Sequence, residues 1–228
     1  MDKELRSLLY QAVATADTGK VVQIIEQDRS LLNARLPGNL TPLMSALFVG
    51  HREFAEHLIR MGAEIDIIAA VLMGDTETVR KFLDIRPALI RKHTPWGGYS
   101  LLHIGALFGD PALVALLLER GIDPNEARQP DRMTPLFFAR KHPYDNAEIL
   151  LSRGADINAR AKHGRTVLHW AAGIGDLEWI KFLLRHGADP NMQTKARQSA
   201  WMLAVKWKRP QAAALFVEFS RNGPRGWN

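Results

Sequence analysis

Cysteine is absent from the 228 residues, and this absence excludes disulfide bonds, thiolate metal sites and thiol nucleophiles. No apolar run approaches the roughly 20 residues that a membrane-spanning helix needs. The first residues, 1–6, show no basic start followed by an apolar stretch, so no secretory signal is visible. Hydrophobic residues make up 46% and charged residues 24%, a balance that excludes a disordered chain. We therefore expect a folded, cytoplasmic protein without membrane contact.

The sequence also lacks the motifs of common catalytic sites. No two histidines stand four apart around a glutamate, there is no Gly-x-Ser-x-Gly phrase, and no glycine-rich loop ends in Gly-Lys-Ser or Gly-Lys-Thr. Without cysteine, the other common zinc-ligand sets cannot be completed. We therefore expect no catalytic residue, no metal site and no cofactor, and we do not expect an enzyme.

Positive charge is concentrated in the second half of the chain. Residues 1–114 hold 12 basic and 13 acidic side chains, whereas residues 115–228 hold 18 basic and 11 acidic ones, which together give the net charge of +6. The segment from Lys195 to Arg209 contains five basic residues and no acidic one. The electric field of this concentrated positive charge favours encounters with an acidic partner. A basic end can also serve only to keep a protein in solution.

Two short phrases recur along the chain at a nearly constant interval. Glycines 121, 154 and 187 each begin a Gly-x-Asp-x-Asn phrase and are evenly spaced, and Gly62 begins a similar one. A second phrase opens with threonine or serine at positions 41, 100, 134, 166 and 199, and the last four of these positions keep almost the same interval. A period of about 33 residues that covers most of the chain indicates a repeat protein.

Each repeat has the signals of two short antiparallel helices. Threonine or serine accepts a hydrogen bond from a free N–H of the first turn, and proline often follows, where its missing N–H costs nothing. A polar break separates the first helix from a second one with apolar residues three and four apart. Glycine in the left-handed conformation then ends the second helix. One helix pair cannot bury both of its faces, so the pairs must stack around a continuous core.

The segment from Gly164 to Asn191 resembles an ankyrin repeat nearly throughout, with Val167 in place of the usual proline. The resemblance implies an all-α fold: a solenoid of about seven stacked helix-turn-helix units with short projecting β-hairpin or turn tips. It covers about residues 5 to 220. We predict one domain over residues 1–221, with a flexible tail at 222–228. The expected repeats, the first and last of them capping repeats, are 5–36, 37–65, 66–95, 96–128, 129–160, 161–193 and 194–221.

Several repeats depart from the pattern. In the third repeat Asp66 leads straight into the first helix, so we expect its projecting hairpin to be missing or stunted. The segment 84–95 is longer than usual and predicts an inserted helical turn. In the fifth repeat His142-Pro143-Tyr144 replaces the helix-breaking glycine.

The positions of two histidines and three tryptophans also predict where these side chains lie. The resemblance implies that His103 and His169 are structural and bond the turn of a neighbouring repeat. We expect Trp170, Trp179 and Trp201 to face neighbouring helices and to lie in the core.

The resemblance further implies a binding surface formed by the hairpin tips and the exposed side of the first helices. In the second to fourth repeats these positions are apolar and aromatic, whereas in the fifth to seventh they are mostly basic. Phe48, Leu72 and Phe108 could instead turn inward and pack between repeats. The candidate partner-binding residues are Phe48, Leu72, Met73, Trp96, Tyr99, Leu107, Phe108, Met133, His142, Lys162, His163, Arg165, Lys195, Gln198, Lys206 and Trp207.

The leading functional hypothesis is a monomeric protein-interaction scaffold whose partner has an apolar patch beside an acidic one. A sharper version is an inhibitor or immunity-type protein that fills the cleft of an enzyme or toxin, with the tip 96–99 as the wedge. The alternative class is nucleic-acid binding, which we favour less because the basic residues span only one repeat. Those basic-end residues are Lys195, Arg197, Lys206, Trp207, Lys208 and Arg209. Steep loss of binding with added salt would distinguish nucleic acid from a protein partner.

Overall fold

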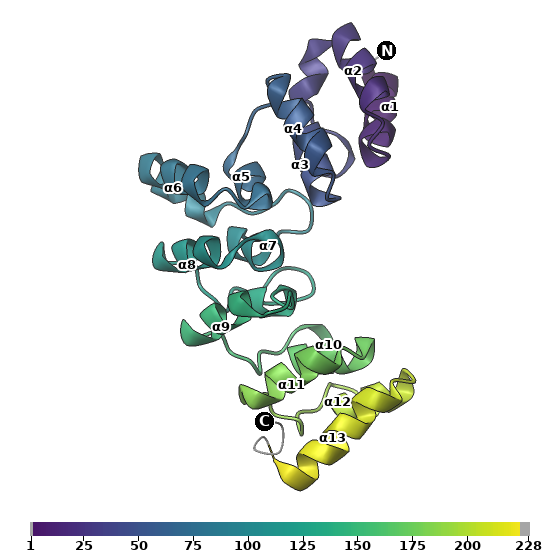
Figure 1. The fold of residues 1–228 in the computed structure, drawn as a ribbon, viewed down its shortest axis with the longest axis vertical. Helices are drawn as coiled ribbons and strands as arrows, with labels where there is room; N and C mark the ends of the chain where they lie inside the picture. The colour runs from purple at the N-terminus through teal and green to yellow at the C-terminus, as the bar shows by residue number, and fades with distance from the viewer. Residues whose placement is uncertain (1, 224–228) are drawn as a thin grey trace. The chain divides into compact units, whose positions relative to one another are not determined.

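The fold is built from helix pairs, as a computed structural model that describes residues 2–223 shows (Figure 1). The chain divides into two compact units, Met1–Ile122 (unit 1) and Asp123–Asn228 (unit 2). Within the described residues there is no strand, and a single antiparallel bridge joins His93 to Ser100 at the fourth-repeat tip. The all-α solenoid predicted from the repeats is therefore confirmed.

Unit 1 contains eight α-helices and three short 3-10 helices over its described residues, 2–122. The α-helices are α1 (Asp2–Ala14), α2 (Thr18–Gln27), α3 (Pro42–Phe48), α4 (Arg52–Arg60), α5 (Ile67–Met73), α6 (Thr76–Ile85), α7 (Leu101–Phe108) and α8 (Pro111–Glu119). The 3-10 helices are η1 (Arg29–Asn33), η2 (Pro37–Asn39) and η3 (Pro87–Arg91). The first helices form a row in which α3 packs against α1 and α5, and α5 packs against α7.

Unit 2 contains five α-helices and two 3-10 helices in its described part. These elements are η4 (Pro135–Phe138), α9 (Asp145–Ser152), η5 (Lys162–Gly164), α10 (Val167–Ile174), α11 (Leu177–Arg185), α12 (Ala200–Lys206) and α13 (Pro210–Asn222). Helix α10 packs against α12, and α11 packs against α13. The expected flexible tail, 222–228, lies outside the described residues from position 224 onward.

The helix ends follow the signals in the sequence. Thr41 Oγ1 accepts from the main-chain N–H of Met44 at 3.2 Å, and Ser199 Oγ accepts from that of Met202 at 3.3 Å. Glycine ends the second helices in the left-handed region, with φ between 87° and 96° at positions 62, 121, 154 and 187. These caps confirm the predicted helix boundaries, because each satisfies main-chain groups that a helix end leaves unpaired.

The irregular repeats also behave as expected. Helix α5 begins immediately after Asp66, whose Oδ1 accepts from the N–H of Ala69 at 2.9 Å, so no hairpin precedes it. The predicted helical turn within 84–95 is η3. In the fifth repeat the first helix is reduced to η4, and Tyr144 adopts φ 74°, the left-handed conformation that glycine supplies elsewhere.

The tryptophan predictions are only partly right. Trp179 is fully buried, as expected, and its ring packs with those of Tyr144 and Phe182 at centroid distances of 5.0 Å. Trp170 and Trp201 were expected in the core, and this is wrong, because they are 39% and 42% exposed. Trp170 lies four residues before Ile174, which is 36% exposed, so the two residues share one partly exposed face of α10.

The two capping histidines are structural. His103 and His169 are 1% and 2% exposed, and each completes a capping box at the start of its helix. The Nδ1 atom of His169 accepts from the N–H of Thr166 at 3.2 Å, and its Nε2 lies 3.1 Å from the main-chain oxygen of Gln198 in the next repeat. The second contact confirms for His169 the link between repeats that the resemblance implied.

Candidate interaction surfaces

An aromatic cluster forms the first candidate surface, in unit 1. It consists of Phe48 at the end of α3, Phe108 at the end of α7, and Trp96 from the fourth-repeat tip. The Phe48 ring lies 6.0 Å from each of the other two, with interplanar angles of 75° to Trp96 and 60° to Phe108. Edge-to-face contacts at such distances stabilise aromatic pairs beyond simple burial.

The missing hairpin of the third repeat explains how Trp96 reaches Phe48. Because α5 follows Asp66 directly, no third-repeat tip stands between the second repeat and the fourth-repeat tip. Trp96 occupies this space and is half-buried there. It was chosen as a projecting wedge, and the structure instead folds it onto the cluster.

The cluster leaves apolar surface open on its outer side. Phe48 is 41%, Val49 50% and Leu107 37% exposed. Leu72 does not belong to this surface, contrary to the sequence-based choice, because it is 4% exposed. The reason is the packing of α5, which lies between α3 and α7 and buries every residue from Ile67 to Leu72.

A tryptophan pocket forms the second candidate surface, in unit 2. It is a cavity of about 100 Å³ lined by Arg165, His169, Trp170, Gly173, Ile174, Leu203 and Trp207. Trp207 lies across the end of α10, where a Cβ on Gly173 would be 3.6 Å from the indole ring. The indole of Trp207 therefore lies close to the main chain at Gly173, and 48% of the surface of Trp207 is exposed.

The hairpin tips beside the pocket carry positive charge and are joined to one another. The main-chain N–H of Lys162 donates to the oxygen of Asp131 at 2.6 Å, and that of Lys195 donates to the oxygen of His163 at 2.9 Å. The side chains of Lys162, His163 and Lys195 are exposed, and Arg165 both follows this tip and lines the pocket. The tips thus hold several basic groups near an apolar cavity.

The remaining sequence-predicted residues lie in different surroundings. Met73 and Met133 are half-buried, and Lys206 is exposed on α12. Tyr99 is half-buried, with its ring 6.2 Å from that of His103, and His142 is exposed against Tyr144 at 5.3 Å. Gln198 is half-buried and contributes its main-chain oxygen to His169. None of these residues lines the tryptophan pocket.

Trp170 is the largest of the pocket residues that sequence reasoning missed, because it was expected in the core. Its spacing of four from Ile174 was the available signal, because residues four apart share one helix face. The other α10 residues from Val167 to Gly173 are buried, so this pair marks the exposed face of the helix. Arg165 and Trp207, in contrast, were both chosen from the sequence.

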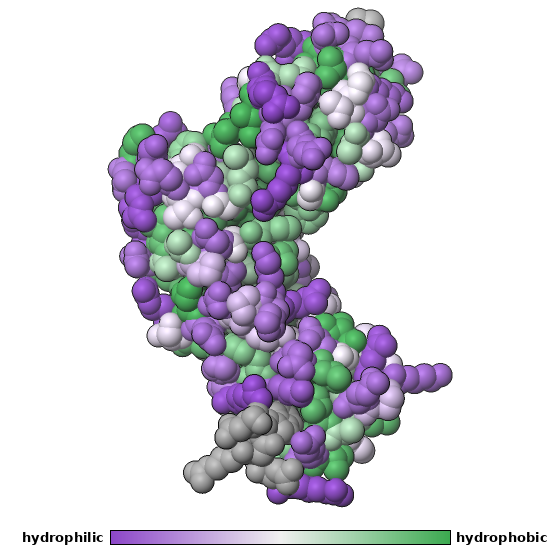
Figure 2. All heavy atoms as spheres, in the orientation of Figure 1, coloured by the Kyte–Doolittle hydropathy of each residue, from purple (hydrophilic) through white to green (hydrophobic). Residues whose placement is uncertain are grey.

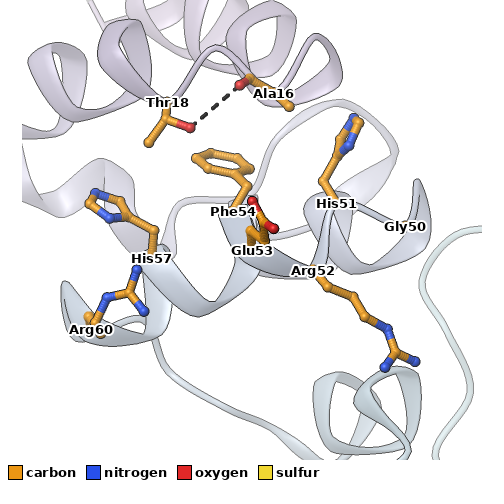
Figure 3. Close-up of a pocket in the computed structure, with 9 residues that line it drawn as sticks. All are labelled: Ala16, Thr18, Gly50, His51, Arg52, Glu53, Phe54, His57 and Arg60. Carbon is orange, nitrogen blue, oxygen red and sulfur yellow. Dashed lines mark hydrogen bonds between the residues drawn. The ribbon is translucent and has the colours of Figure 1, made fainter.

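A larger hollow of about 640 Å³ lies between the α1–α2 turn and α4. It is lined by Ala16, Thr18, Gly50, His51, Arg52, Glu53, Phe54, His57 and Arg60. Figure 3 shows that Arg52 extends away from the other labelled residues, and Phe54 lies between the two histidines. Its charged groups do not converge on one point, so the hollow lacks the arrangement of a binding site for a small ligand.

Within residues 2–223 no group of three or more histidine, aspartate or glutamate side chains is arranged to hold a metal ion. No helix in the same range is long and apolar enough to cross a membrane.

Comparisons with known proteins match this architecture. The family model "Ankyrin repeat" matches residues 38–70 and 163–195, and the model "Ankyrin repeats (3 copies)" matches residues 67–161. The chain is similar to a transient receptor potential cation channel subfamily A member 1 homolog of Caenorhabditis elegans, with 26% identity over 88% of this chain and 17% of that protein. It is also 37% identical to human ankyrin repeat and SOCS box protein 6, over 42% of this chain and 25% of the relative.

A third relative is the mouse B-cell lymphoma 3 protein homolog, which is 32% identical over 47% of this chain and 24% of its own length. The chain therefore spans a quarter or less of each of these three relatives. Taken together, the family models cover residues 38–195 except Lys162, and helices α3 to α11 and the turn glycines at 62, 121, 154 and 187 lie within these matches. The chain belongs to the ankyrin repeat family.

Proposed function

We propose that this chain is a protein-interaction scaffold that docks a partner protein on unit 2, through the tryptophan pocket and the basic tips. The observation that carries the proposal is that Arg165 lines the same cavity as Trp170 and Trp207. A partner that fits has an apolar side chain for the pocket and acidic groups for the tips. The proposal includes no chemistry by this chain and no cofactor.

The size of the pocket favours a protein over a small ligand. Small-molecule sites usually enclose about 300–1,000 Å³, whereas this cavity has about 100 Å³ and suits a single side chain. Exposed tryptophan and arginine are also the residues that most often dominate the free energy of protein association. The pocket therefore has the composition of an anchor point within a larger contact.

The surrounding charges determine which partners approach. Lys162 and Lys195 are exposed on neighbouring tips that main-chain hydrogen bonds join, so their positive charges lie near each other and repel. An acidic surface relieves this repulsion and is attracted over distance. The sequence analysis expected the apolar part of the partner at the second to fourth repeats and the acidic part at the fifth to seventh. We propose instead that both parts bind unit 2, because Arg165 lies next to the basic tip and also lines the pocket.

The alternatives have weaker support. The inhibitor hypothesis used the tip 96–99 as a wedge, and Trp96 is packed against Phe48 instead of projecting. The nucleic-acid hypothesis counted Arg209, whose Nε donates to the oxygen of Gly173 at 3.3 Å and whose aliphatic part lies against Gly175. Arg209 thus has a structural role, which leaves fewer groups to hold phosphates. We also propose a cytoplasmic location, and its support is the sequence, which shows no secretory signal.

A capture experiment with matched tryptophan variants tests the proposal. Wild type, Trp207→Ala and Trp201→Ala are each used to capture proteins from a lysate of the source cell, at low and at moderately high salt. The two tryptophans are 48% and 42% exposed, but Trp201 lies outside the pocket. We expect one protein to be retained by wild type and Trp201→Ala in both salts and lost by Trp207→Ala.

Two results would contradict the proposal. Equal capture by Trp207→Ala and wild type would show that the pocket is not part of the interface. Capture of nucleic acid that disappears with salt and ignores Trp207→Ala would move the function to the basic residues alone.

A further inference from the structure

The hairpin tips of the fifth, sixth and seventh repeats close in the same way. In each tip the main-chain N–H of the first residue donates to the main-chain oxygen of the last residue, at 2.8 to 3.0 Å. The three tips are residues 128–133, 161–165 and 194–198. Because the closing hydrogen bond is shared, residues at the same place in the three tips can be compared with one another.

Two of these tips place arginine where the backbone favours glycine. The residue before the last one is left-handed in each tip, and it is Gly164 in the sixth repeat but Arg132 in the fifth, with φ 59°, and Arg197 in the seventh, with φ 55°. A side chain is strained in this conformation, and asparagine, aspartate and histidine tolerate it better than arginine. Such strain is typical of residues that a function retains.

Neither arginine has a structural role that explains its position. Arg132 and Arg197 are both exposed. Within the described residues no side chain or main-chain group forms a hydrogen bond or an ion pair with either guanidinium group. Glycine would therefore keep the turn and remove the strain, whereas arginine adds a positive charge at the end of the tip.

Main-chain hydrogen bonds hold the three tips side by side. The N–H of Lys162 bonds to the fifth-repeat tip, and the N–H of Lys195 bonds to the sixth-repeat tip. The side chains of both lysines are exposed, as are those of Arg132 and Arg197. We call these four residues the basic row, because each of the three tips contributes at least one of them.

The charge of the basic row is not balanced by acidic residues of the tips. Asp131 is the one acidic residue in the three tips, and it forms an ion pair with Arg128. Figure 2 shows hydrophilic side chains beside hydrophobic ones on the face of unit 2 that it presents. Positive charge gathered in this way attracts an acidic ligand, and a guanidinium group binds a carboxylate through two parallel hydrogen bonds.

The stacking of the repeats determines the form of such a ligand. Helix α10 packs against α12, and packed helices lie about 8–10 Å apart, so neighbouring tips are separated by about the same distance. An extended polypeptide advances about 3.3 Å per residue. About three residues therefore lead from one tip to the next, and about seven cross all three tips.

We propose that the basic row binds an extended acidic segment of the partner, with carboxylates about three residues apart and one at each tip. This inference rests on the proposed function and adds to it Arg132, Arg197 and the form of the ligand. A nucleic-acid strand fits less well, because the three tips contain no phenylalanine, tyrosine or tryptophan for a base to stack on.

An NMR titration of the whole chain at low salt tests the inference. The probe is the peptide Glu-Ser-Gly-Glu-Ser-Gly-Glu with blocked ends, and the matched peptide has the same composition with its three glutamates adjacent. We expect the spaced peptide to shift the amide signals of all three tips and to bind more tightly than the matched peptide. Arg132→Gly with Arg197→Gly should weaken its binding about 5- to 30-fold, since two exposed ion pairs are lost.

Urea unfolding separates binding from a structural role of the arginines. We expect the double glycine variant to unfold at the same urea concentration as wild type or at a higher one, because glycine relieves the left-handed strain. A control, Lys20→Gln with Lys92→Gln, removes the same charge at exposed positions of unit 1 and should bind the peptide like wild type. Trp207→Ala should also bind it like wild type, because the peptide has no side chain for the pocket.

Four results would overturn the inference. They are a spaced peptide that leaves the tip signals of wild type unchanged, a matched peptide that binds equally well, a double glycine variant that binds like wild type or is less stable, and an oligothymidylate of similar charge that binds more tightly than the peptide. The proposed function is decided separately by capture with Trp207→Ala, so the basic row can hold where the pocket fails, and the reverse.

Discussion

At the scale of the residue, His169 connects a local signal to the packing of two repeats. Its Nδ1 completes a capping box with Thr166, which the spacing of three residues makes possible. Its Nε2 faces the main-chain oxygen of Gln198 at 3.1 Å, a contact that exists only because the next repeat stacks there. The Nδ1 atom accepts a hydrogen bond, so the neutral form with a proton on Nε2 satisfies both contacts.

Burial lowers the pKa of His169 below its ordinary value of 6.5, although the hydrogen bond to Gln198 opposes this shift. Above pH 6.5 the histidine is neutral in both folded and unfolded chains. As pH falls below 6.5, the unfolded chain binds a proton that the folded one does not, so the free energy of unfolding falls by up to about 1.4 kcal/mol per pH unit.

Urea unfolding at several pH values between 8 and 5 measures this effect. We expect His169→Gln to lower stability at pH 8 and to lose part of the pH dependence between 6.5 and 5. The control is His163→Asn, at an exposed position whose φ of 61° asparagine tolerates, and it should keep the wild-type slope. An unchanged slope in His169→Gln would show that other groups set the pH dependence.

At the scale of the element, the Asp-x-Asn phrase joins each repeat to the following one. The aspartate side chain of the phrase accepts a hydrogen bond from the main-chain N–H two residues ahead, at 2.8 Å in each of Asp123, Asp156 and Asp189. This hydrogen bond closes the tight turn predicted from the sequence. The asparagine of the phrase has a second role that the sequence did not reveal. Asn125 Oδ1 accepts from the N–H of Asp156 at 2.7 Å, and its Nδ2 donates to the oxygen of Gly154 at 2.8 Å.

The last copy of this phrase supplies a matched control. Asn191 ends the final phrase, and no later copy of the phrase follows within the described residues for its side chain to bond. We expect Asn125→Ala to lower the free energy of unfolding by about 1–2 kcal/mol, because two hydrogen bonds between repeats are lost. Asn191→Ala should change it by less than about 0.5 kcal/mol. Equal losses in the two variants, measured by urea unfolding, would contradict the bridging role.

At the scale of the whole molecule, the sequence halves differ in charge and the structure gives each unit a different surface. Unit 1 presents the apolar side of the aromatic cluster, and unit 2 presents the tryptophan pocket beside basic tips. The excess of basic residues in the second half of the sequence therefore lies mainly in unit 2, which is the unit to which we assign the partner. Charge of this kind acts mainly on the rate of association.

Charge reversal on the tips tests this assignment. We expect Lys162→Glu with Lys195→Glu to slow association with the captured partner several-fold at low salt, and less at high salt, while dissociation changes little. The control, Lys20→Glu with Lys92→Glu, makes the same change in net charge at exposed positions of unit 1. Surface plasmon resonance measures both rates. Equal slowing in the control would show that only net charge matters.

The local structure of this protein was determined by its sequence. The caps at Thr41, Ser100, Thr166 and Ser199, the left-handed glycines, the absent third hairpin and the inserted turn η3 were predicted correctly. Thr134 was also expected to cap a helix, and this is wrong, because its side chain makes no cap hydrogen bond to η4. Each of the correct predictions depends on neighbouring residues, whose hydrogen bonds and backbone preferences act over one or two helical turns. The repeat boundaries remain a prediction.

Exposure was decided only by the tertiary structure. Trp170, Trp179 and Trp201 look alike as apolar helix residues, yet Trp179 is buried and the other two are exposed. Trp96 contacts Phe48 because the third repeat lacks its hairpin, and Trp201 stays 42% exposed although α12 packs against both α10 and α13. Whether a side chain is core or surface depends on which elements stack against it, and that information lies in contacts far apart in the chain.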